Sequence, residues 1–147
     1  MLASTGVKVQ KNENSVLPLP DGALFLSRVS KSRLGVEEGD KLVQGFAPLA
    51  AKILNGTAIE FENHPDLVSL KEKIESAPAV VFSVGSRIEV NDLLDDIKKV
   101  CEMNLKTCFV CQDVPEAAKP AEFAPCIITS YDQTVNAMRA VCDVLKG

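Results

Sequence analysis

Aromatic residues are scarce in this chain of 147 residues: tryptophan is absent and there is a single tyrosine. Proteins that stack nucleic-acid bases use aromatic side chains for this purpose, so no such platform is expected here. The formal net charge of −4 points the same way, because binding to phosphates needs an excess of lysine and arginine. We therefore predict that the protein has no nucleic-acid partner.

Long apolar runs are also missing. No stretch approaches the roughly 20 residues that span a bilayer, and residues 1–20 lack the basic start and apolar centre of a signal peptide. We expect no membrane partner, and the chain is predicted to be cytoplasmic. One histidine and five cysteines, set mostly within apolar runs, are typical of reduced core thiols. They make a poor set of metal ligands, so no metal site is predicted. No sequence motif indicates a particular cofactor, so the cofactor is left unknown.

Apolar runs that alternate with helical stripes dominate what is present. Residues 79–86 form a continuous run that ends in a small polar turn, which is typical of a strand buried on both faces. Further strands are expected at residues 23–26, 57–61, 108–111 and 125–129. Helical spacing of apolar residues falls between them, most clearly over residues 90–105. After the first strand, Asn55-Gly56 predicts a left-handed helix end, and Pro48 predicts a kink within that helix.

This alternation predicts parallel pairing through right-handed crossovers. We expect an α/β fold with a single doubly wound, mostly parallel five-stranded sheet and helices on both faces. The suggested order is 2-1-3-4-5, which is flavodoxin-like or Rossmann-like. Residues 1–22 are interpreted as a loosely held N-terminal arm with a short edge strand over residues 7–10, and residues 23–147 as a single α/β domain. Two prolines make residues 114–123 an irregular connection.

The predicted topology brings two polar loops together. Ligands of open α/β sheets bind beyond the carboxyl ends of the strands, where the strand order reverses, and loops 27–33 and 83–87 meet there. Their hydroxyl, guanidinium and amide groups suit an anion such as phosphate. The candidate ligand-binding residues are Ser27, Arg28, Ser30, Lys31, Ser83, Gly85, Ser86 and Arg87. The first hypothesis is therefore a small-molecule-binding domain that holds a nucleotide or another phosphate-bearing ligand at this edge.

Two features weigh against that anion site. The loop after residue 82 has one glycine instead of a glycine-rich phosphate fingerprint. Glu37 and Glu38 fall near the start of the next expected helix, where they would stabilise its positive end themselves and repel a phosphate.

Glu89 allows two interpretations. Ser86 and Glu89 have the spacing of a capping box, in which Ser86 accepts from the amide of Glu89 and Glu89 reaches back to the amide of Ser86. Alternatively, Glu89 is the nucleophile or base of a glycosidase or transferase. The order of elements resembles that of nucleoside deoxyribosyltransferase-like and TIR-like domains, and this resemblance implies a catalytic glutamate near that point. Because the resemblance rests on layout only, the cap is favoured and no catalytic residue is assigned.

Other polar motifs have structural interpretations. Cys108 and Cys111 form a C-x-x-C motif, but residues three apart in a strand point to opposite faces, so core packing is favoured over zinc or redox chemistry. His64, beside Pro65, is predicted to be a surface residue that caps a helix. The absence of a catalytic constellation leaves a second class of function open: a non-catalytic interaction module that forms a homodimer through an edge strand or an outer helix.

Overall fold

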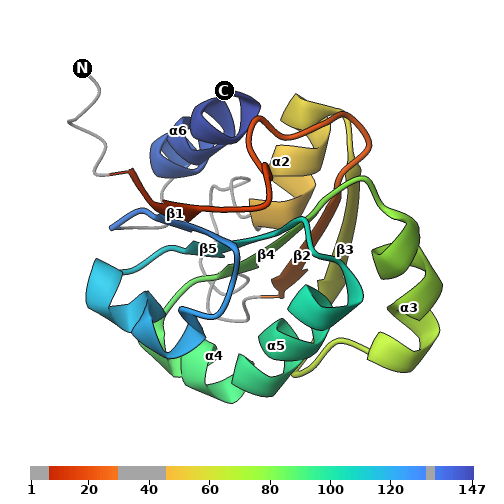
Figure 1. The fold of residues 1–147 in the computed structure, drawn as a ribbon. Coiled ribbons are helices and arrows are strands. Elements are labelled where there is room, and N and C mark those ends of the chain that lie inside the picture. Colours follow the sequence, from red (N-terminus) through yellow and green to blue (C-terminus); the bar gives the residue numbers. More distant parts are fainter. Residues whose placement is uncertain (1–6, 30–45, 132–134) are drawn as a thin grey trace, which may run out of the picture.

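Strands and helices alternate along the computed structural model, which describes residues 7–29, 46–131 and 135–147 (Figure 1). The strands are β1 (Lys8–Asn12), β2 (Leu24–Arg28), β3 (Thr57–Phe61), β4 (Val80–Val84), β5 (Thr107–Cys111) and β6 (Cys126–Thr129). The helices are α2 (Phe46–Leu54), α3 (Leu67–Ser76), α4 (Arg87–Asp92), α5 (Leu94–Met103), the 3-10 helix η3 (Pro115–Ala121) and α6 (Val135–Lys146). The fold is of the α/β class, as predicted.

The sheet has six strands and is mixed, in the order β1-β6-β5-β4-β2-β3. The prediction of a five-stranded sheet is wrong, and the flavodoxin-like form is not confirmed. The five strands from β2 to β6 pair in parallel, in the relative order suggested by the sequence. The sixth strand, β1, pairs with β6 in the antiparallel sense and covers what would otherwise be an open edge.

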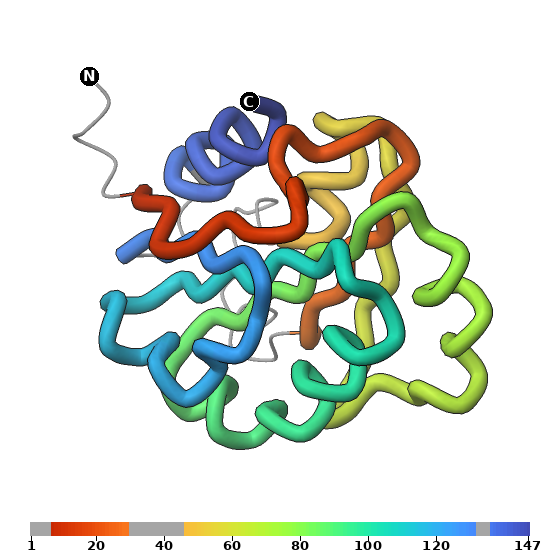
Figure 2. Tube along the Cα trace, viewed as in Figure 1, coloured from red at the N-terminus to blue at the C-terminus, as the bar shows by residue number. Residues whose placement is uncertain are grey.

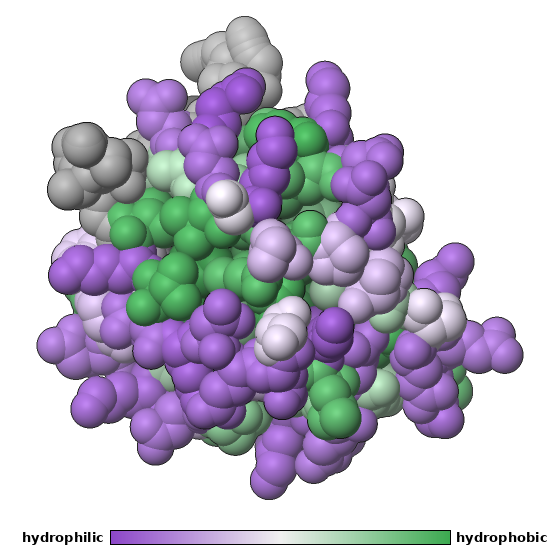
Figure 3. All heavy atoms as spheres, turned by 45° about the horizontal axis from the view of Figure 1, so that its top comes forward, coloured by the Kyte–Doolittle hydropathy of each residue, from purple (hydrophilic) through white to green (hydrophobic). Residues whose placement is uncertain are grey.

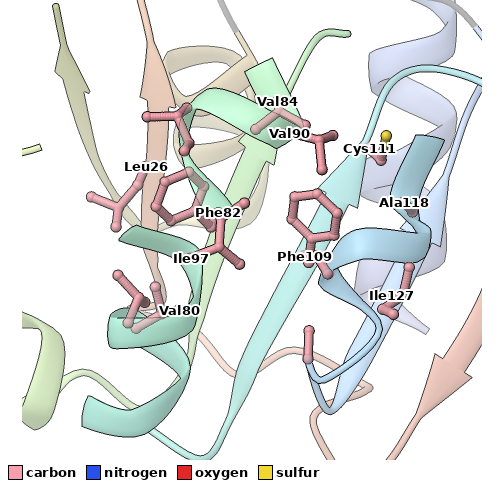
Figure 4. Packing of buried hydrophobic residues seen from close by; sticks show 14 of the residues in the cluster. Leu26, Val80, Phe82, Val84, Val90, Ile97, Phe109, Cys111, Ala118 and Ile127 are labelled. Carbon is pink, nitrogen blue, oxygen red and sulfur yellow. The ribbon is translucent and has the colours of Figure 1, made fainter. Parts of the chain in front are cut away.

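Two helix layers cover the sheet, and each has its own apolar cluster. One face packs against α2 and α6 through residues such as Phe25, Val110 and Val141. The other face packs against α3, α4, α5 and η3 through residues such as Phe82 and Ile97. Figure 4 shows this second cluster, with Phe82 and Phe109 projecting from neighbouring strands toward the same layer. The alternation of side chains along each strand separates the two clusters.

Residues 13–22 pass beside α6 and α2 before the chain enters β2 (Figure 2). Val16 is fully buried, and the amide of Leu19 donates to the carbonyl of Leu145 at 2.7 Å. The amide of Gly22 donates to the carbonyl of Asn55 at 2.9 Å. The described part of the expected loose arm is thus bound to the domain. Figure 3 shows the face that includes this region, where apolar residues are surrounded by hydrophilic ones.

The junction between α2 and β3 differs from its prediction in detail. Asn55 adopts the left-handed conformation at φ 59°, whereas Gly56 has no positive φ. Gly56 is needed for space, because a Cβ atom there would lie 2.4 Å from the carbonyl oxygen of Ala23. Pro48 lies in the first turn of α2, where a missing amide hydrogen is tolerated. Leu42 and Val43, which precede this helix at the same apolar spacing, lie outside the described residues.

The helices in the described ranges are all too short or too polar to cross a lipid bilayer.

Candidate functional site

The carboxyl edge of the sheet gathers the described members of the predicted site. Ser27 and Arg28 end β2, and Ser83 lies near the end of β4, directly opposite Ser27 in the parallel ladder. Gly85, Ser86 and Arg87 follow at the start of α4. Ser30 and Lys31 lie outside the described residues, as do Glu37 and Glu38. Whether this group binds a ligand remains a prediction.

The two serine hydroxyls are buried and contact the backbone. Ser83 is 1% exposed, and its Oγ donates to the carbonyl of Leu26 at 3.5 Å. Ser27 is 5% exposed, and its Oγ accepts from the amide of Ala47, in the first turn of α2, at 3.4 Å. These contacts tie β4 to β2 and β2 to α2, so the two hydroxyls already have a structural role.

Arg28 is held by two neighbours instead of projecting into an open site. Its Nε and Nη2 donate to the carbonyl oxygen of Asn63 at 3.0 and 2.6 Å. Its Nη1 lies 3.4 Å from the carboxylate of Asp92, at the end of α4. The guanidinium therefore links β2 to the loop after β3 and to α4, and most of its donors are occupied.

Glu89 caps α4, but not in the predicted way. The amide of Glu89 donates to Ser86 Oγ at 3.4 Å, as expected for a capping serine. The carboxylate oxygen Oε1 of Glu89 accepts from the amide of Gly85 at 2.7 Å, one residue earlier than the amide of Ser86. The prediction for the second half of the capping box is thus wrong by one residue. The carboxylate is half-buried at the mouth of β4.

A second carboxylate, Asp113, lies just beyond the neighbouring strand β5. Its Oδ2 accepts from the amide of Arg87 at 2.9 Å, and its Oδ1 accepts from the amide of Val114 at 2.7 Å. Both oxygens are therefore occupied by the backbone, whereas Glu89 has one oxygen outside its contact with Gly85. Sequence reasoning did not single out Asp113, because an acidic residue in a loop carries no distinguishing signal.

Buried polar side chains continue along this edge beyond the predicted group. Gln112 directly follows β5, its amide donates to the carbonyl of Val84 at 2.9 Å, and its side chain is 5% exposed. Within the described ranges its Nε2 has no hydrogen-bond partner. Ser130, just after β6, is fully buried, and its amide donates to the carbonyl of Cys111 at 3.0 Å.

His64 does not cap a helix. Its Nδ1 lies 2.7 Å from Oδ2 of Asp96, on α5, and its side chain is 58% exposed. The N-cap of α3 is Asp66, whose Oδ1 accepts from the amide of Ser69 at 3.2 Å. The predicted surface position of His64 is confirmed, and its predicted capping role is wrong. Within the described ranges no nucleophile contacts this histidine.

The cysteines lie where periodicity predicted. Cys108 belongs to the cluster under α2 and α6, and Cys111 to the opposite cluster, so the two thiols lie on opposite faces of β5. Burial raises the pKa of the Cys111 and Cys142 thiols to about 12, and it also raises the pKa of Cys108. A neutral, buried thiol is a poor nucleophile and a poor metal ligand. The structural interpretation of the C-x-x-C motif is therefore supported.

Comparison with known proteins identifies the fold but not the family. No family model and no curated protein matches the sequence. Three similar solved structures each match 96% of this chain. They are a fungal multi-domain GH3 β-N-acetylglucosaminidase with a GCN5-related glucosamine N-acetyltransferase region (TM-score 0.74, 18% identity), a β-glucosidase from Listeria innocua (TM-score 0.72, 14%) and a glycoside hydrolase family 3 β-N-acetylglucosaminidase from Paenibacillus (TM-score 0.71, 14%).

This likeness concerns the fold, because the sequence identities are low. The match covers only 16%, 24% and 28% of those three proteins, so this chain spans less than a third of their length. The chain thus has the fold of an α/β domain found within glycoside-processing enzymes. None of the three is described as a nucleotide-binding protein, and the prediction of a nucleotide or phosphate ligand gains no support from them.

Proposed function

We propose that this chain is the α/β domain of a β-glycoside-processing enzyme and that it presents Glu89 to a sugar at the carboxyl edge of its sheet. The observation that carries the proposal is the match of 96% of the chain to three enzymes whose names specify β-glucosides or β-N-acetylglucosaminides as substrates. Glycosidase or transferase chemistry through Glu89 is also one of the interpretations of the sequence alone.

The geometry around Glu89 fits this role. Cleavage of glycosides uses a pair of carboxyl groups, one of which transfers a proton at the glycosidic oxygen. The contact of Oε1 with the amide of Gly85 at 2.7 Å holds the Glu89 carboxylate at the end of the central strand. The other oxygen of this half-buried group makes no hydrogen bond within the described ranges and is available to a ligand. Asp113 is a weaker candidate, because backbone amides occupy both its oxygens. The second carboxyl group is not assigned.

Binding of a charged sugar mimic tests the proposal. The structure of the Listeria innocua enzyme contains isofagomine, whose ring amine is cationic at neutral pH and pairs with carboxylates. Titration calorimetry of the full chain with isofagomine is expected to show saturable binding. Glu89→Gln should weaken that binding at least tenfold, because it removes the charge but retains an acceptor for the amide of Gly85. Glu102→Gln, on an exposed residue of α5, is the matched control and should leave the affinity unchanged.

Two results would overturn the proposal. One is the absence of isofagomine binding at millimolar concentration, checked by thermal shift, since a ligand at 100 times its Kd stabilises the folded state by about 2.7 kcal/mol. The other is equal binding by the wild-type chain and by Glu89→Gln. The interaction module and homodimer suggested by the sequence remain a separate prediction.

A further inference from the structure

A cavity of about 470 Å³ lies between β1 and η3, on the face of the sheet that α4 and α5 also cover. This volume is within the range of about 300–1,000 Å³ that is typical of small-molecule sites. Its floor includes Ala118 of η3 and Ile127 of β6, which are 4% and 5% exposed. Figure 4 shows both residues at the η3 end of the apolar cluster. None of the candidate residues at the carboxyl edge lines this cavity.

The hollow follows from the connection between β5 and β6. Pro115 begins this segment and Pro120 lies within it, so it forms the 7-residue 3-10 helix η3 instead of a full α-helix. The crossovers from β3 to β4 and from β4 to β5 each contain an α-helix of 10 residues, α3 and α5 respectively. The shorter cover leaves a hollow beside Ile127 of β6 and residues 10–11 of β1. The irregular connection predicted for residues 114–123 is thus the cause of the cavity.

A β-bulge in β1 turns two consecutive side chains into the same cavity. Neighbouring residues of a regular strand point to opposite faces, yet both Gln10 and Lys11 line the hollow. The pairing register with β6 shifts between Val9 and Lys11, which accounts for the re-aimed side chains. Gln10 Nε2 donates to Thr129 Oγ1 at 3.0 Å, and Lys11 Nζ donates to the carbonyl of Glu122 at 2.7 Å. These two bonds connect the wall formed by β1 to the sheet and to the end of η3.

The remaining polar groups of the cavity are unpaired and balanced in charge. Glu116, Lys119 and Glu122 are exposed, and within the described ranges their side chains form no hydrogen bond or ion pair. Together with Lys11 the lining carries two positive and two negative charges. Carboxylates accept hydrogen bonds and the ammonium groups donate them, which matches hydroxyl groups that do both. The lining has no net positive charge to favour a phosphate and no aromatic side chain to stack a base.

We propose that this cavity binds a neutral, hydroxyl-rich molecule of monosaccharide size, with Glu116, Lys119 and Glu122 as its hydrogen-bonding partners. The apolar floor of Ala118 and Ile127 supports the C–H face of such a ligand. The proposal does not rest on the function proposed above, because it uses neither Glu89 nor the similarity to glycoside-processing enzymes.

Chemical-shift mapping of the full chain with D-glucose tests this site. Saturable amide shifts are expected for Gln10, Lys11, residues 116–119 and residues 121–122. Lys119→Met removes a donor without touching the core and should weaken this binding at least fivefold. Lys98→Met, on an exposed position of α5, is the matched control and should not change the affinity. Glucose 6-phosphate should bind no more tightly than glucose, because the lining charges cancel.

Three outcomes would overturn the assignment: no saturable shift at the cavity, an unchanged affinity in Lys119→Met, or a tenfold preference for glucose 6-phosphate. The same spectra separate this proposal from the preceding one. Glu89→Gln should leave the shifts of Gln10 and Lys119 intact, whereas Lys119→Met should leave the binding of isofagomine near Gly85 and Glu89 intact. Failure of either site therefore does not decide the other.

Discussion

Gly56 offers the sharpest test of how β2, β3 and α2 meet. A Cβ atom at this position would lie 2.4 Å from the carbonyl oxygen of Ala23 and 2.6 Å from Cε1 of Phe25. Neither neighbour can move freely. The Ala23 carbonyl accepts from the amide of Thr57 at 3.0 Å, at the start of the β2–β3 pairing, and Phe25 is fully buried. Gly56→Ala therefore forces the backbone itself to shift.

The expected cost follows from this geometry. Overpacking of a well-packed core costs roughly 1–3 kcal/mol, and a clash with a hydrogen-bonded carbonyl belongs at the upper end. We expect Gly56→Ala to lower the free energy of unfolding by about 3 kcal/mol. Gly22→Ala is the matched control. Gly22 has φ +85°, but its nearest neighbour, Pro78 Cγ, would be 3.7 Å from an added Cβ. It should cost only the backbone strain of a left-handed residue, about 1 kcal/mol.

Urea denaturation followed by circular dichroism is the suitable assay, because the chain has no tryptophan and one tyrosine. The difference in free energy comes from the shift in the denaturation midpoint at unchanged slope. The reasoning would be refuted if Gly56→Ala cost no more than Gly22→Ala, since the close approach to the Ala23 carbonyl would then have no energetic consequence.

Two further predictions concern the contacts of the Arg28 side chain and the burial of the Cys142 thiol. Arg28→Met removes the hydrogen bonds to Asn63 and the ion pair with Asp92. We expect it to lower the free energy of unfolding, measured by urea denaturation, by about 1–3 kcal/mol. A decrease below about 0.5 kcal/mol would contradict the role of Arg28 in linking β2 to the loop after β3 and to α4. Burial raises the pKa of Cys142 from its ordinary value of 9.0 to about 12, so the unfolded thiol ionises first and stability should fall as the pH rises above 9.0. Cys142→Ala should reduce this slope, and a thiol-reactive dye that labels the native protein as fast as the denatured one would contradict the burial of the thiols.

The pattern of apolar residues along each segment was sufficient to predict most of the fold. Apolar runs identified β2, β4, β5 and β6, because strands covered by helices on both faces are buried along their length and are therefore mostly apolar. The alternation of side chains correctly separated Cys108 from Cys111. The short edge strand predicted at residues 7–10 corresponds to β1 (Lys8–Asn12), but its pairing with β6 as the sixth strand of the sheet was not predicted. Residues 8–12 are mostly polar and mostly exposed, and their strand conformation depends on the free edge of β6, which lies more than 100 residues away in the sequence.

The site was less predictable than the fold. Spacing identified Ser86 as a cap and Glu89 as a residue of interest, and the topology brought Ser27 opposite Ser83. The atoms that these side chains contact could not be predicted from the sequence. That Glu89 contacts Gly85, Arg28 contacts Asn63, and His64 contacts Asp96 depends on loop paths that bring together groups up to 35 residues apart. A charged side chain in a loop looks the same in sequence whether it faces a ligand or a carbonyl.

The sequence by itself determined the class of fold, the buried strands and the absence of a recognisable catalytic motif, because these follow from composition and periodicity along one segment at a time. The tertiary structure alone decided which polar groups are occupied and where open space remains. The cavity beside η3 illustrates the reason. It exists because a proline-containing connection is too short to cover the sheet and because a bulge turns Gln10 and Lys11 the same way. The prolines of η3 and the bulge of β1 are both local features. They form one site only because the fold packs these two distant segments side by side.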